Sequence, residues 1–294
     1  MKIGLQLPHF RPANAATMRS WLIDTARTAD QGGFDSLWFM DHFFQLGGWL
    51  GKPEEDMLEG YTALGFVAGV TERIKLGLLV GGVIYRQPAL VVKSISTLDV
   101  LSAGRAYLGI GAAWYELESK SLGFPFPSLK ERFEWLEEGL QIFHRMFDDE
   151  ENGAYAGTHN QLDYPVNHPQ PLTKPHPPIL IGGMGPKKTL RMVAQYADAC
   201  NFFAGAGMEK LEESLGILQE HCVRLGRDYD EIEKTVLATV ENPQEGGIAA
   251  AGELATNLQA LGFEHVIFNV NGLYSPETMQ ALVEDLVPVV HALP

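Results

Sequence analysis

The sequence predicts a (β/α)8 barrel (TIM barrel) with insertions, an α/β fold in which parallel strands alternate with helices. Eight short apolar runs are typical of buried strands, and each is followed along the chain by a segment with helical periodicity. Most connections are short, as in the right-handed β-α-β units of a parallel sheet. Eight such units favour a closed barrel over an open doubly wound sheet, the second possibility. We therefore interpret residues 1–294 as one domain.

The boundaries of these elements follow from where the apolar runs and the helical periodicity stop. Pro8 ends the first strand, Gly32 and Gly33 end the first helix, and Gly104 ends the third helix. The predicted strands cover residues 3–7, 34–40, 74–80, 106–110, 178–181, 199–203, 235–240 and 266–270. The predicted helices cover residues 15–31, 61–70, 89–101, 129–147, 187–196, 209–225, 250–261 and 276–293.

The stretch FDSLWFMDHFF, residues 34–44, contains the most informative of these strands. Its apolar and aromatic run predicts a strand that is buried on both faces. Asp41 and His42 follow directly, and in barrels and doubly wound sheets the carboxyl ends of strands carry the chemistry. A carboxylate beside an imidazole is suited to orienting or accepting a proton. The alternative is that His42 is a hydrogen-bonded structural histidine and Asp41 caps the next loop.

One segment departs from the alternation of strands and helices. Residues 148–178 contain six prolines, and the stretch AYAGTHNQLDY within them alternates as a small hairpin does. Because strand–helix units resume after this segment, we interpret it as an insertion and not as a linker between domains. A second long connection covers residues 111–128.

Composition excludes several classes of function. The net charge of -15 argues against nucleic acid and against an anionic membrane surface, because both require a basic footprint. No segment approaches the roughly 20 apolar residues that cross a bilayer, and the amino-terminal sequence lacks the features of a signal peptide. Cys200 and Cys222 lack the CxxC spacing of a zinc site. We therefore expect no metal. We also expect a cytoplasmic protein whose two thiols are reduced.

Polar and glycine residues follow several predicted strands, where a barrel would bring them together. Besides Asp41 and His42, these strand ends contain Gln6, His9 and residues 80–82, 109–114, 182–185 and 201–203. Glycine lets a backbone approach a planar ring or a phosphate closely, although tight turns also require it. The strand ends are therefore the candidate site.

The most specific glycine stretch is GGMGPKKT, residues 182–189. It predicts a helix whose first position is Pro186, with unpaired N–H groups that favour an anion. Lys187 and Lys188 would add positive charge, although surface lysines need no function. The stretch is not a GxxxxGK[ST] phosphate loop, and GxGxxG is absent.

Four segments together resemble a known family: MKIGLQLP, FDSLWFMDHFF, the long run from IKLGLLVGG to GLQIF, and PILIGGMGPKKTLRMVAQYADACNFF. The chain is similar to the luciferase-like monooxygenase superfamily over nearly its whole length. Within that superfamily it resembles the oxidoreductases that depend on a deazaflavin, coenzyme F420.

The resemblance implies a bacterial luciferase-like barrel with a flavin or deazaflavin at its mouth, and hydride transfer to or from C5 of the deazaflavin. It implies that His42, with Asp41, is catalytic as a proton donor or acceptor, and that the protein is a homodimer. A strand bulge, often with a non-proline cis peptide, would fall at about residues 79–81. The residues implied to bind the cofactor are Asp41, Leu79, Val80, Gly81, Gly109, Gly111, Ala112, Trp114, Gly182, Gly183 and Gly185.

The chain departs from the pattern of this family in two respects. Where sugar-phosphate dehydrogenases of the branch carry an acidic residue, this chain has Trp114, and it lacks a basic cluster for a substrate phosphate. Three functions stay open: an F420-dependent oxidoreductase acting on a small organic molecule, an FMN-dependent monooxygenase with oxygen and a partner reductase, and a non-catalytic flavin-binding protein. The loops 43–59 and 148–178 set the substrate, and their sequence does not identify it.

Overall fold

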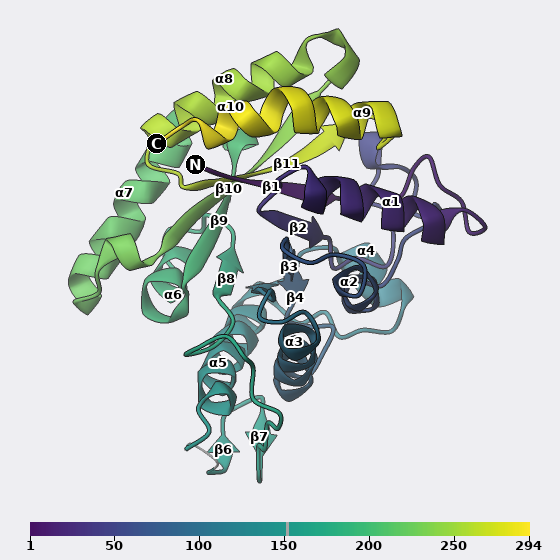
Figure 1. The fold of residues 1–294 in the computed structure, drawn as a ribbon. Coiled ribbons are helices and arrows are strands. Elements are labelled where there is room, and N and C mark those ends of the chain that lie inside the picture. Colours follow the sequence, from purple (N-terminus) through teal and green to yellow (C-terminus); the bar gives the residue numbers. More distant parts are fainter. Residues whose placement is uncertain (151–152) are drawn as a thin grey trace.

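The computed structural model describes residues 1–150 and 153–294, and its centre is a parallel sheet curved into a nearly closed barrel (Figure 1). In the described residues the sheet has nine strands, in the order β3-β2-β1-β11-β10-β9-β8-β5-β4. The strands are β1 (Lys2–Leu7), β2 (Ser36–Phe39), β3 (Lys75–Leu78), β4 (Gly81–Gly82), β5 (Leu108–Gly111), β8 (Ile179–Gly182), β9 (Ala199–Phe203), β10 (Glu233–Glu241) and β11 (His265–Asn271).

These strands agree with the predicted eight because β3 and β4 are two parts of one strand, separated by Leu79 and Val80. Main-chain hydrogen bonds close the barrel between β3 and the residues that precede β5. The Leu76 N–H donates to the carbonyl of Arg105, and the Tyr107 N–H donates to the carbonyl of Leu76. The prediction of a parallel barrel is therefore confirmed.

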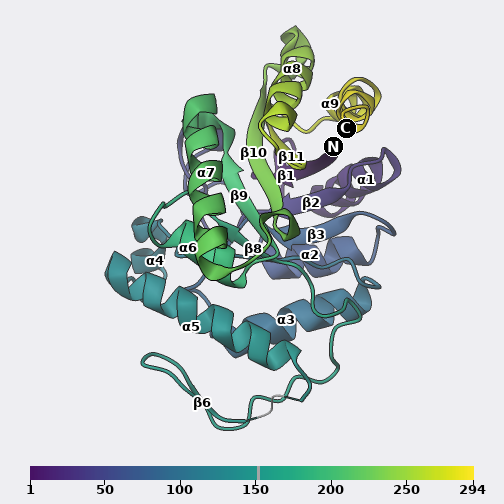
Figure 2. The same cartoon turned by 90° about the vertical axis from the view of Figure 1, so that its left-hand side faces the viewer.

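Helices cover the outer face of the barrel (Figures 1 and 2). The insertion contains the predicted hairpin, in which β6 (Tyr155–Ala156) pairs antiparallel with β7 (Gln161–Leu162). Residues 151 and 152 of that insertion lie outside the described residues. The helices are α1 (Met18–Gln31), α2 (Gly60–Ala68), α3 (Pro88–Leu101), α4 (Glu116–Ser121), α5 (Leu129–Phe147), α6 (Thr189–Tyr196), α7 (Met208–Leu225), α8 (Gly247–Ala260), α9 (Pro276–Ala281) and α10 (Val287–His291).

Three predictions about helices need correction. Helix α6 begins at Thr189 and not at Pro186, which lies in a turn, because the first helical hydrogen bond joins the Met192 N–H to the carbonyl of Lys188. The single helix predicted over residues 276–293 is interrupted by a π-helical turn, η5 (Leu282–Leu286), and ends at His291. Helix α4 was not predicted, since its six residues, ELESKS, show no apolar periodicity.

The barrel interior is filled by a small apolar cluster, separate from the larger core between strands and helices. Every residue of β2 is buried, as predicted for a strand with two covered faces. Trp38 points inward, and its ring packs edge-on against Tyr107 with 5.3 Å between the ring centroids. The other buried members are Leu79, Leu180, Ala199 and Ile267. This plug leaves room for a ligand only at the ends of the barrel.

The two chain ends lie side by side at the amino-terminal end of the barrel (Figures 1 and 2). The amino group of Met1 donates to the carbonyl of Leu293 at 2.6 Å. The β6–β7 hairpin lies beyond α5, away from the sheet, in both views. Among the described helices, none is long and apolar enough to cross a membrane.

Gly109→Ala is expected to prevent folding, because the added Cβ would lie 1.9 Å from the carbonyl oxygen of Leu78 in the neighbouring strand. Gly65→Ala is the matched control. A Cβ at Gly65, inside α2, meets nothing within 4 Å, so alanine should stabilise the helix by about 1 kcal/mol. Soluble yield and thermal melting by circular dichroism check both variants. A wild-type melting temperature for Gly109→Ala would contradict this close contact.

Candidate active site

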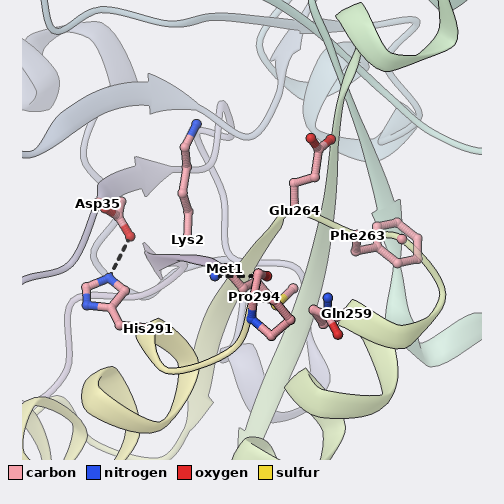
Figure 3. Close-up of a pocket in the computed structure, with 9 residues that line it drawn as sticks. Met1, Lys2, Asp35, Gln259, Phe263, Glu264, His291 and Pro294 are labelled. Carbon is pink, nitrogen blue, oxygen red and sulfur yellow. Dashed lines mark hydrogen bonds and ion pairs between the residues drawn. The ribbon is translucent and has the colours of Figure 1, made fainter.

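A cavity of about 500 Å³ lies at the carboxyl ends of the strands, within the range typical of small-molecule sites. A second hollow, of about 450 Å³, lies at the opposite end of the barrel (Figure 3). There Asp35 accepts a hydrogen bond from His291 at 3.0 Å, and no residue of the predicted site is present. We take the cavity at the carboxyl ends as the candidate active site, because barrels place their chemistry there.

His42 lies on the wall of this cavity, half-buried, with its ring orientation fixed on one side. Its Nδ1 lies 3.1 Å from Oε1 of Glu118. Because a carboxylate only accepts hydrogen bonds, Nδ1 is the donor in this contact. Trp114 and Tyr115 pack edge-on against the imidazole, with ring centroids 5.7 and 5.9 Å away. Glu118 and the two rings thus fix the orientation of the imidazole, and Nε2 of His42 has no partner among the described residues.

Glu118 is the residue that organises this part of the site. It is fully buried on α4 and accepts hydrogen bonds from Phe43 N–H (2.5 Å), Phe44 N–H (2.8 Å) and the Tyr85 hydroxyl (2.6 Å), besides that from His42. Burial alone would raise the pKa of Glu118, but the hydrogen bonds from His42 and Tyr85 outweigh burial and hold that pKa below its ordinary value. Glu118 therefore stays ionised and anchors the loop after β2.

The sequence predictions did not identify Glu118. It lies 76 residues from His42 and within the connection 111–128, to which no element was assigned. A signal did exist: two acidic residues, Glu116 and Glu118, follow the glycines at the end of β5. Only the fold distinguishes the two, since Glu118 is buried and Glu116 is exposed.

Asp41 precedes His42 in the sequence and is buried, but its side chain has different hydrogen-bond partners. Its Oδ2 accepts from the Gly82 N–H at 2.9 Å and from Arg86 at 2.8 Å. Arg86 also donates to Glu59, at 2.5 Å, so its charge is shared between two carboxylates. Oδ1 of Asp41 is buried and has no hydrogen-bond partner in the described part of the chain. Asp41 thus ties the end of β2 to β4 and leaves one acceptor free at the cavity.

The floor of the cavity is the interruption between β3 and β4. The peptide bond between Leu79 and Val80 is cis, at the position that the family resemblance indicated. Gln6 donates to the Leu79 carbonyl at 3.3 Å, and Asn269 donates to Gln6 Oε1 at 3.0 Å. Oδ1 of Asn269 is a second buried acceptor for which the described residues offer no donor. The sequence had placed Gln6 at a strand end, but not Asn269.

The side chain of Val80 explains two of the predicted glycines. A Cβ on Gly182 would lie 2.8 Å from Cγ2 of Val80, and one on Gly111 would lie 3.0 Å from the same atom. A larger residue at either position would therefore force Val80 to shift, so the packing of the floor favours glycine whatever binds above it. Gly109 is required by the main chain of β3, as described above.

Most of the predicted cofactor-binding residues do come together. Those that line the cavity are Asp41, Leu79, Val80, Gly81, Gly111, Ala112, Trp114, Gly182 and Gly183, together with His42. Gly109 and Gly185 are not part of its lining. His9, also at a strand end, is buried against Tyr274 with 5.2 Å between the rings, and burial lowers its pKa to about 4. His9 is therefore a neutral wall residue behind the site.

The predicted anion site has a different geometry from an N-terminal helix turn. Gly183 adopts a φ of +115°, a conformation suited to glycine, and the Thr189 side chain lies beside it on the cavity lining. The ammonium group of Lys188 lies 5.1 Å from the ring centroid of Phe133, another lining residue. A backbone loop, a hydroxyl and a cation thus adjoin one side of the cavity.

Fold and site together define a class: a parallel barrel whose cavity lies at the carboxyl ends of the strands, over an interrupted third strand. The sequence profile of one family, described as "Luciferase-like monooxygenase", matches residues 1–241. The protein belongs to this family.

Three known proteins show the range of the similarity. The F420-dependent glucose-6-phosphate dehydrogenase of Kineococcus radiotolerans is 30% identical over 225 residues, which are 73% of this chain and 62% of that protein. The FMNH(2)-dependent dimethylsulfone monooxygenase of Pseudomonas putida is 25% identical over 277 residues, 88% of this chain and 70% of that protein. The solved structure of an F420-dependent secondary alcohol dehydrogenase, in complex with an F420-acetone adduct, has a TM-score of 0.81 at 18% identity, covering 98% of both chains. That last similarity concerns the fold.

Proposed function

We propose that the protein is an oxidoreductase that binds the deazaflavin coenzyme F420 and transfers a hydride between it and a small organic substrate. The observation that carries this proposal is His42, whose Nδ1 is held by Glu118 while Nε2 stays free at an apolar cavity. Proton transfer coupled to hydride transfer needs a positioned acid or base, and a carboxylate that orients the imidazole provides that positioning. The F420-dependent relative supports the choice of coenzyme.

The residues present fit such a coenzyme. A planar ring needs flat apolar walls, and the cavity offers Leu79 and Val80 on its floor. Its imide N–H is a donor, and two buried acceptors, Oδ1 of Asp41 and Oδ1 of Asn269, have no donor among the described residues. A phosphate on its side chain would be held by the Gly183 loop, Thr189 and Lys188. The two buried acceptors therefore match the imide end of the coenzyme, and Lys188 matches its phosphate end.

When bound, the deazaflavin supplies a carbon, C5, that accepts or returns a hydride. His42 performs the proton part of the reaction: Nε2 takes the hydroxyl proton of an alcohol, or returns it to a carbonyl oxygen. Glu118 fixes the tautomer and stabilises the imidazolium that forms. Trp114 and Tyr115 pack edge-on against the His42 ring and hold it in place.

An FMN-dependent monooxygenase is the second candidate, supported by the relative from Pseudomonas putida. FMN differs from the deazaflavin at ring position five, nitrogen in place of carbon, and would need oxygen and a partner reductase. The third possibility, a flavin-binding protein without catalysis, gives no reason for the His42–Glu118 pair, because a purely structural pair would not need Nε2 free at the cavity.

Titration of the apo-protein separates these candidates. Coenzyme F420 and FMN are added in parallel and binding is followed by fluorescence. The proposal expects F420 to bind in the micromolar range or tighter, and FMN at least ten times more weakly. Tight binding of FMN alone would move the protein to the oxygen-using enzymes. If neither bound, the proposed function would be lost.

A further inference from the structure

We propose that the substrate is an uncharged, largely apolar alcohol, or the corresponding ketone, larger than a two- or three-carbon molecule. This inference rests on the proposed function and names its substrate class. It starts from the rim of the cavity, where Leu129 and Phe203 line the cavity without belonging to the residues assigned to the coenzyme. The rim belongs to loops and element ends, the parts of a barrel that select substrates.

Three large apolar side chains line the cavity and are also strongly exposed: Trp114, Leu129 and Phe203, with exposed fractions of 61%, 57% and 48%. They come from three separate parts of the chain, the loop after β5, the first turn of α5 and the end of β9. Single exposed apolar residues are ordinary, but several that converge on one cavity are typical of a binding groove. The occupant of this rim therefore has an apolar surface of its own.

The cavity offers no charge to a substrate anion. Among the described residues that line it, none is lysine or arginine. The nearby cations are occupied: Arg86 binds Asp41 and Glu59, and Arg132 donates to the Ala113 carbonyl at 2.7 Å. Lys188 lies on the side of Gly183 and Thr189, where the coenzyme phosphate is placed.

One proton acceptor remains for the substrate, Nε2 of His42, and it matches a single hydroxyl group. The step balances with the oxidised deazaflavin as co-reactant. The carbinol carbon gives up its hydrogen together with the bonding electron pair to C5, the hydroxyl proton goes to Nε2, and a carbon–oxygen double bond forms. A polyol would leave further hydroxyl groups against Trp114 and Phe203 without partners, at a cost for each. One hydroxyl on a hydrocarbon body is therefore the best match.

A homologous series of alcohols tests this inference on the coenzyme-loaded protein. The ratio kcat/KM should rise from 2-butanol to 2-octanol, by up to about fourfold for each methylene that reaches the rim. Phe203→Ala should lower kcat/KM for 2-octanol about tenfold more than for 2-butanol. Leu101→Ala, which removes an exposed apolar side chain far from the cavity, is the matched control and should change neither value.

Calorimetry of ketone binding gives a readout that does not depend on turnover. With coenzyme present, 2-octanone should bind at least tenfold more tightly than 2-butanone, and Phe203→Ala should reduce that ratio. Equal binding of the two ketones, or faster turnover of glucose 6-phosphate than of 2-octanol, would overturn the inference while leaving the proposed function intact. Failure of F420 itself to bind is the distinct outcome that removes the proposed function.

Discussion

Replacing His42 by alanine is expected to lower kcat/KM for hydride transfer by two to four orders of magnitude, the usual effect of losing a positioned general base. The reason is that Nε2 is the acceptor at the cavity that is both free and held in one orientation, through Glu118. The measurement is anaerobic reduction of F420 by an alcohol, followed by the absorbance of the coenzyme.

Binding of F420 is the control for this variant, because His42 is assigned to proton transfer and not to binding the coenzyme. The dissociation constant measured by fluorescence should stay within about threefold of wild type. His42→Asn keeps a polar group of similar size and should be nearly as inactive, because an amide takes no proton at neutral pH. A loss of activity below tenfold in both variants would contradict the assigned role.

Glu118→Gln is expected to reduce both activity and stability. The carboxylate accepts from His42 with one oxygen and from the Phe43 and Phe44 N–H groups with the other, whereas an amide has only one oxygen. If its NH2 faces Phe43 and Phe44, two buried backbone N–H groups lose their acceptor, at about 1–3 kcal/mol each. If it faces His42, the imidazole must accept at Nδ1, which moves the ring proton to Nε2 and removes the base. We expect kcat to fall about 100-fold and the melting temperature to fall by several degrees.

Glu116→Gln is the matched control for this substitution. Glu116 lies on the same short helix but is exposed and pairs with Lys120 at 2.6 Å, an i,i+4 ion pair of the kind that contributes little. Activity and melting temperature should both stay at wild-type values. Equal effects of the two substitutions would show that charge on α4, and not the buried contacts of Glu118, accounts for the result.

The pH dependence of stability gives a separate test of Glu118. The pKa of this carboxyl is lower in the folded protein than its ordinary value of about 4.5. The contribution of ionised Glu118 to the unfolding free energy is therefore fully present above pH 4.5. It is lost as the pH falls through the pKa of Glu118 in the folded protein. The difference in unfolding free energy between wild type and Glu118→Gln should accordingly be constant near neutral pH and shrink in acid.

The strands could be predicted because each is an apolar run that ends at a glycine, a proline or a polar residue. β9 was predicted to the residue and β2 somewhat too long, since Phe34 and Met40 are apolar and buried without belonging to the strand ladder. α4 could not be predicted. It is held by the burial of Glu118, a contact with the loop after β2 that no local pattern contains.

The site was predictable to the extent that it lies at strand ends. Asp41 and His42 come just after β2, separated from it only by Met40, and the fold places both at the cavity. What the sequence could not give is which carboxylate orients His42: Asp41 is adjacent in the chain, yet Glu118 is the partner. Likewise the glycines at 111 and 182 were predicted as cofactor contacts and do line the cavity, but the side chain of Val80 also favours glycine at both positions.

A crystal structure of the protein grown with F420 tests the central claim most directly. The account predicts the deazaflavin ring inside the cavity of about 500 Å³, in contact with both Val80 and His42, and its phosphate beside Gly183 and Thr189. A ring bound outside this cavity, or one from which His42 is turned away, would contradict the assignment of these residues to coenzyme and proton transfer.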